Sequence, residues 1–123
     1  MTENSLKRHL NTCMHNLRDI EKKVKESDVW IEFLEKSKCV DKDKKDQRIS
    51  EIKKAREEMI LVYNEMMDEL TIAFEQLPHH LTTTMELHYI SGFPWEIIAE
   101  KLDISPRSVY RRRDLAIRIL VQK

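Results

Sequence analysis

The chain has 123 residues, of which 36% are charged and only one is glycine, a composition that suits long helices and leaves strands little room. Its length allows one small domain, or a helical hairpin with a head of about 45 residues. The 22 basic and 22 acidic residues cancel, so the chain as a whole does not attract nucleic acid, and any such attraction must be local.

The first third of the chain predicts a long helix with a single apolar seam. The seam positions alternate steps of four and three residues, which is the heptad spacing of a coiled coil. They are Leu6, Leu10, Cys13, Leu17, Ile20, Val24, Ser27, Ile31 and Leu34. The residues between them are largely charged, so we expect those residues to face solvent.

A second seam follows and matches the first in antiparallel register. It consists of Ile49, Ile52, Arg56, Met59, Tyr63, Met66, Leu70, Ala73 and Leu77. The two polar seam residues, Ser27 and Arg56, then meet and help to fix the register. The least apolar run in this part of the chain, residues 38–46, is the predicted loop. Residues 1–77 are therefore predicted to form an antiparallel α-helical hairpin.

The cysteines and the junction histidines do not predict a bridge or a metal centre. Cys13 lies on the seam and Cys39 lies near the loop, a full arm away, so we expect both thiols to stay reduced. His79 and His80 are adjacent and point in different directions, and no cysteine or carboxylate stands at ligand spacing from them. We expect no metal and no cofactor.

Residues 78–123 predict a separate head made of short helices. Its first helix is expected to start at residues 81–84, where threonine hydroxyls can cap the free amides of a helix start. The only glycine of the chain, Gly92, follows that helix and marks a turn. The whole chain is thus predicted to be all-α, with a hairpin at 1–77 and a head at 78–123.

The end of the head has the pattern of a helix–turn–helix. Pro94 is tolerated in the first turn of a helix over residues 95–102, which carries an amphipathic stripe. Asp103 occupies the turn position that favours left-handed backbone. Ser105 is expected to cap the last helix and Pro106 to start it.

The last helix gathers positive charge. Residues 104–123 hold six basic residues against one acidic residue, and the arginines fall largely on the face opposite the apolar one. The alternative without a ligand is a solvent-exposed face with Arg111–Asp114 and Asp114–Arg118 ion pairs. Because the charge follows a correct turn and cap, we favour binding to double-stranded DNA.

The run from Leu87 to Ser105, continued through residues 108–120, resembles region 4 of bacterial sigma factors. A short chain with a helical N-terminal half and this end also resembles phage late-transcription regulators of the ArpU/RinA type. The resemblance implies readout of a promoter element by the last helix and contact with RNA polymerase. It places the base-reading residues at Arg107, Tyr110 and Arg111. We expect phosphate contacts from six neighbouring side chains: Thr83, Ser105, Ser108, Arg112, Arg113 and Arg118.

Both arms of the predicted hairpin carry more apolar surface than one partner helix covers. The surplus residues are Trp30, Phe33, Ile60, Met67 and Phe74. Either they cover the docked head, or two hairpins form a four-helix bundle that presents two heads. We favour the homodimer, because a single helix–turn–helix makes few base contacts and dimers read two half-sites.

The function predicted from these patterns is sequence-specific DNA binding in transcription, as a phage or prophage late-gene activator. No phosphate-binding glycine loop or nucleophile motif is present, so we do not expect an enzyme. No apolar run reaches membrane-spanning length and no signal peptide opens the chain, which predicts the cytoplasm of a bacterial host cell. Two alternatives remain: a protein-interaction module for RNA polymerase or a sigma-appropriating partner, and a small-terminase-like DNA-packaging subunit.

Overall fold

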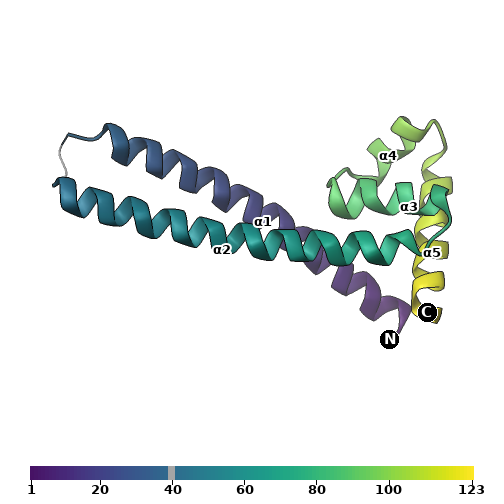
Figure 1. The fold of residues 1–123 in the computed structure, drawn as a ribbon. Coiled ribbons are helices and arrows are strands. Elements are labelled where there is room, and N and C mark those ends of the chain that lie inside the picture. The colour runs from purple at the N-terminus through teal and green to yellow at the C-terminus, as the bar shows by residue number, and fades with distance from the viewer. Residues whose placement is uncertain (39–40) are drawn as a thin grey trace. The chain divides into compact units, whose positions relative to one another are not determined.

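The computed structural model describes residues 1–38 and 41–123, and these residues fold almost entirely into helices (Figure 1). In chain order the elements are α1 (Glu3–Lys36), α2 (Lys42–Glu75), α3 (His79–Met85), the π-helical turn η1 (Glu86–Ile90), α4 (Trp95–Leu102) and α5 (Pro106–Gln122). The described part of the chain contains no strand, so the all-α prediction is confirmed. Cys39 lies outside the described residues.

The chain divides into two units. The hairpin unit comprises residues 17–65, and the head unit comprises residues 1–16 together with residues 66–123. The sequence placed a division after residue 77. In the structure, the head unit also includes the first part of α1 and the last part of α2.

In the hairpin unit, α1 and α2 pair through the predicted seams. Every seam residue of this unit is buried or half-buried, and Leu17, Ile31 and Leu34 are buried. The Tyr63 hydroxyl donates to the Glu21 carboxylate at 2.7 Å, which is an antiparallel contact between the two helices. The two polar seam residues bind other partners: the Ser27 hydroxyl donates to the Lys23 carbonyl of its own helix at 2.9 Å.

Arg56 instead forms an ion pair with Asp28, the neighbour of Ser27 on α1. The carboxylate offers the guanidinium a charged acceptor, which is a stronger partner than a serine hydroxyl. The antiparallel pairing itself is the predicted one.

The connection between the two long helices is shorter than predicted. Residues 38–46 were expected to form the loop, but α2 begins at Lys42. Asp41 explains the difference, because its carboxylate accepts the amides of Asp43 at 2.9 Å and Lys44 at 3.3 Å and so caps the helix. Lys45 donates to the Ser37 carbonyl at 3.1 Å, close to the C-terminal end of α1.

The head unit has its own apolar core. The residues with no exposed surface there are Phe74, Leu81, Thr84, Met85, Ile98, Val109, Ala116 and Ile117. Phe74 packs on Tyr89, with 6.1 Å between the ring centres. The prediction that Phe74 belongs to an exposed dimerisation stripe is therefore wrong: the core of the head covers its ring.

The first short helix of the head begins two residues earlier than expected. α3 starts at His79 directly after Pro78, and no side chain caps it. The threonines do not act as N-caps: the Thr82 hydroxyl donates to the Phe74 carbonyl at 2.7 Å, and the Thr84 hydroxyl donates to the His80 carbonyl at 2.8 Å. Thr82 thereby satisfies a carbonyl at the end of α2.

Candidate nucleic-acid interface

The turn between α4 and α5 has the predicted helix–turn–helix geometry. Asp103 adopts left-handed backbone, with φ 54° and ψ 47°, and the Ile104 amide donates to the Ala99 carbonyl at 3.0 Å. Ser105 caps α5 by accepting the Ser108 amide at 3.1 Å, and Pro106 is the first helical residue. The predicted roles of Asp103 in the turn, of Ser105 as the cap and of Pro106 as the first helical residue are confirmed. The predicted turn at Gly92 is confirmed as well, because its φ is 82°.

One face of α5 is held in the head by apolar packing. Val109, Ala116 and Ile117 have no exposed surface, and Val109 shares a cluster with Ile98 and Ala99 of α4. This packing fixes α5 against α4 and determines which side of α5 faces solvent.

The exposed side of α5 carries guanidinium groups without acidic partners. Arg107, Arg111 and Arg118 are exposed and Arg112 is half-buried. Among the described residues, none of these four side chains forms an ion pair. The expected alternative of Arg111–Asp114 and Asp114–Arg118 pairs does not form. At 100° per residue, Arg107, Arg111 and Arg118 share the exposed face, whereas Arg112 lies at the edge of the buried side. A helix face with three uncompensated positive charges is suited to the phosphates of a nucleic acid.

Arg113 has a different environment from the other arginines of α5. Its guanidinium carbon lies 5.0 Å from the centre of the Tyr110 ring and 5.7 Å from the centre of the Trp95 ring. It also forms an ion pair with Asp114 at 2.9 Å, and Asp114 lies 3.6 Å from the Lys7 ammonium of α1. These contacts hold Arg113 against the aromatic rings of the head, and its phosphate contact stays a prediction.

Tyr110 joins the two helices of the motif. Its hydroxyl donates to the Glu96 carboxylate at 3.0 Å. The bond to Glu96 raises the pKa of Tyr110 above its ordinary value. The pKa of Glu96 is lowered, first by the backbone amide of Glu96 itself and then by the Tyr110 hydroxyl, so this carboxyl is ionised beside the arginine face.

A buried histidine, His88, packs against the Trp95 ring. The His88 ring stacks on the Trp95 ring with 3.8 Å between centres and 17° between planes, and its Nδ1 donates to the Phe93 carbonyl at 2.7 Å. Burial lowers the pKa of His88, an effect that the hydrogen bond to Phe93 opposes. The neutral ring is therefore the form that fits this stack.

The remaining predicted phosphate contacts lie at two places. Ser105 and Ser108 bond to each other at 2.9 Å at the start of α5, beside Arg107. Thr83 is half-buried on α3, and no described contact joins it to the arginine face. The structure thus brings Arg107, Tyr110, Arg111 and the two serines onto one helix, whereas Thr83 belongs to another.

Three side chains of this region were not recognised from the sequence: Glu96, Trp95 and His88. Trp95 and Glu96 open α4, and Tyr110 and Arg113 are three residues apart on α5, so they share one side of that helix. The three-residue spacing of Tyr110 and Arg113 on α5, combined with the helix–turn–helix prediction, could have indicated that these two residues contact Trp95 and Glu96 of α4.

A family model described as ECF sigma factor matches residues 34–123. The match includes the whole of α2 and the whole helix–turn–helix. No curated protein and no solved structure gives a significant match. No helix within residues 1–38 and 41–123 is long and apolar enough to cross a membrane.

Proposed function

This chain belongs to the ECF sigma factor family, and we propose that it is a sequence-specific DNA-binding transcription regulator. We further propose that it is encoded by a phage or prophage and activates late genes. Membership of the family indicates a DNA-binding, transcription-related role. The ArpU/RinA-type assignment and the late-gene target are the finer part of the proposal, and they rest on the resemblance of the sequence.

The exposed face of α5 supports this proposal most directly. Arg107, Arg111 and Arg118 project from a helix whose opposite face is anchored in the core, and they have no acidic partner among the described residues. Exposed like charges on one helix repel each other, and a phosphate backbone relieves that repulsion.

In the proposed mechanism, α5 lies in the major groove. Arg107 and Arg111 are near its N-terminal end, where recognition helices contact base edges, and arginine can bind guanine through two parallel hydrogen bonds. Tyr110 lies to one side of these two arginines on the same part of α5 and is held by Glu96. Arg112 and Arg118 bind phosphates and set the position of the helix on the duplex. Arg113 acts indirectly, by fixing the aromatic rings between the helices.

The partners follow from the same proposal. One helix–turn–helix reads few base pairs, so the chain is proposed to act as a homodimer on two half-sites. RNA polymerase is proposed as a protein partner, by analogy with sigma factors. The proposed location is the bacterial cytoplasm, and no enzymatic activity is proposed.

Selection of bound duplexes from a random DNA pool tests this function. Wild type is expected to enrich a motif, and the double variant Arg107→Glu/Arg111→Glu is expected to enrich none. Lys53→Glu/Lys54→Glu is the matched control, because it changes the net charge equally at exposed residues of α2. Loss of the motif in both variants, or in neither, would contradict readout by α5.

A further inference from the structure

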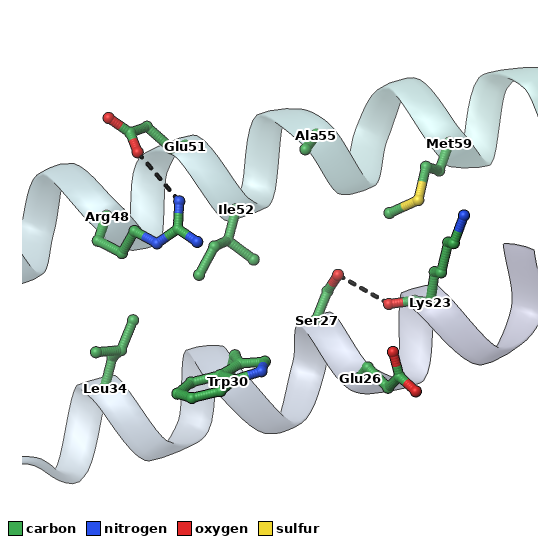
Figure 2. A pocket seen from close by; sticks show the side chains of 10 residues that line it. All are labelled: Lys23, Glu26, Ser27, Trp30, Leu34, Arg48, Glu51, Ile52, Ala55 and Met59. Carbon is green, nitrogen blue, oxygen red and sulfur yellow. Dashed lines mark hydrogen bonds and ion pairs between the residues drawn. The ribbon is translucent and has the colours of Figure 1, made fainter.

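α1 carries three large apolar side chains in solvent, two on the face opposite α2 and one, Trp30, at the side of the helix. Val29, Trp30 and Phe33 are 66%, 57% and 59% exposed. The rings of Trp30 and Phe33 meet edge to face, with 5.7 Å between their centres. Trp30 also borders a groove between α1 and α2, which Leu34, Ile52 and Met59 line (Figure 2) and whose volume is about 540 Å³. A contiguous apolar surface of this kind marks an interaction site on a protein that is otherwise highly charged.

Four residues of this face form a second heptad stripe. Glu26, Val29, Phe33 and Lys36 follow one another at steps of three, four and three residues. Rotation by 100° per residue places them on the opposite side of α1 from Ile31, which is buried in the seam with α2. We call this set the outer stripe. It has an apolar centre with one acidic end and one basic end.

We propose that a second copy of this chain docks on the outer stripe in antiparallel orientation. Val29 then lies against Phe33 of the partner subunit, and Glu26 lies against Lys36 of the partner subunit. A parallel arrangement would put like charges together at both ends of the stripe, whereas the antiparallel one pairs opposite charges at both ends. The stripe is therefore complementary to itself.

The two-fold axis of this arrangement passes at the level of Ile31. Trp30 is one residue away from it, so the two indole rings of the dimer lie close together beside the stripe. Within the chain, Lys36 forms an ion pair with Glu32 at 2.7 Å, but both groups are exposed and the pair contributes little. Lys36 is thus available to Glu26 of the partner subunit.

The extent of the outer stripe sets the strength of the dimer. Three apolar side chains and the stems of the charged ones form a patch at the small end of specific interfaces, which predicts a dissociation constant in roughly the micromolar range. Ile60 and Met67 lie on α2 and are not part of this interface, which narrows the predicted dimerisation set to Trp30 and Phe33 with Val29. The inference rests on the homodimer in the proposed function and does not depend on DNA binding.

Sedimentation of the full chain without DNA, over about 1 to 300 μM, tests the interface. Wild type is expected to form a dimer, and Phe33→Glu is expected to raise its dissociation constant at least ~100-fold, because the charge meets an apolar side chain. Leu61→Glu is the matched control: Leu61 is 61% exposed on the outer face of α2, and its variant is expected to dimerise like wild type. A monomeric wild type, or equal effects of the two variants, would overturn the proposal.

A charge exchange tests the register. Glu26→Lys and Lys36→Glu are each expected to weaken the dimer by about three- to thirty-fold, because each puts like charges together at both ends of the interface. The double variant Glu26→Lys/Lys36→Glu restores opposite charges and is expected to return to within about three-fold of wild type. If the double variant is as weak as the single ones, the antiparallel register is wrong. Because no DNA is present, a failure here is distinct from a failure of DNA readout.

Discussion

The hydroxyl of Tyr110 donates to the carboxylate of Glu96 at 3.0 Å and joins α5 to α4 at the arginine face. The bond fixes the Tyr110 ring against α4, where the ring also contacts Trp95 and Arg113, and it occupies the ionised carboxylate of Glu96. Tyr110→Phe keeps the ring but frees Glu96. We expect its affinity for the selected duplex to fall about three- to ten-fold without loss of fold. Fluorescence anisotropy with labelled duplex measures this.

Tyr63→Phe is the control for that measurement. It also loses a tyrosine–glutamate hydrogen bond, to Glu21, but in the hairpin unit. Its DNA affinity is expected to stay at the wild-type value. An equal fall in both variants would show that the effect of Tyr110 is not local to the helix–turn–helix.

Arg113 is expected to contribute to the stability of the head, whereas Arg118 is expected to contribute to DNA affinity. Arg113→Ala removes the contacts with Tyr110, Trp95 and Asp114, and is expected to lower the free energy of unfolding by about 1–2 kcal/mol. Arg118→Ala is expected to leave stability within about 0.5 kcal/mol, because Arg118 is exposed and has no described partner. It should weaken binding to all duplexes alike and reduce the slope of log affinity against log salt by about 0.9. Thermal unfolding and a salt titration distinguish the two roles, and identical behaviour of the variants would contradict them.

The buried His88 predicts that acid destabilises the head. Its pKa in the folded chain is lowered by burial from 6.5, so the folded state binds fewer protons than the unfolded state as the pH falls below that value. Its contribution to stability is complete above pH 6.5 and is lost as the pH falls through the lower, folded pKa. The melting temperature of wild type is expected to fall more between about pH 7.5 and about pH 5.5 than that of His88→Gln. His79→Gln, an exposed control, should retain the wild-type dependence; if His88→Gln retains it too, His88 is not its source.

Phe74 is expected to act as a core residue and not as a surface contact. Phe74→Ala leaves a cavity beside Tyr89 and should lower the free energy of unfolding by about 3–5 kcal/mol. Ile72→Ala, on the same helix but 62% exposed, should change it by less than about 0.5 kcal/mol. Chemical denaturation gives both values, and a small effect at Phe74 would contradict the packing described for the head.

The periodicity of the sequence predicted the long helices well, because heptad spacing directly reports which side of a helix is apolar. It does not report what covers that side. Phe74 and Trp30 both looked like surplus apolar residues, yet the ring of one is fully buried by the head and the ring of the other is 57% exposed. The contacts that distinguish them come from residues far away in the sequence.

Local chemistry predicted the turn of the helix–turn–helix but not the roles of all its charges. Asp103 and Ser105 act through their own backbone and the next few residues, so their conformations could be predicted from the sequence. Arg113 carries the same charge as its neighbours, and only the packing of Trp95 and Tyr110 separates it from them. α2 begins at Lys42 because Asp41 caps it. The run of residues 41–46 contains three aspartates among lysines, so the sequence alone does not indicate which of them is the cap.

We propose above that α5 reads DNA sequence through Arg107 and Arg111. The most direct test is the ratio of the Kd for a scrambled duplex to the Kd for the selected duplex, at one fixed salt concentration. Arg107→Ala and Arg111→Ala are each expected to lower this ratio by about 5- to 150-fold, because each loses about 1–3 kcal/mol of base discrimination, while Arg118→Ala should leave the ratio unchanged. A ratio that stays at the wild-type value in both Arg107→Ala and Arg111→Ala would show that sequence is read elsewhere.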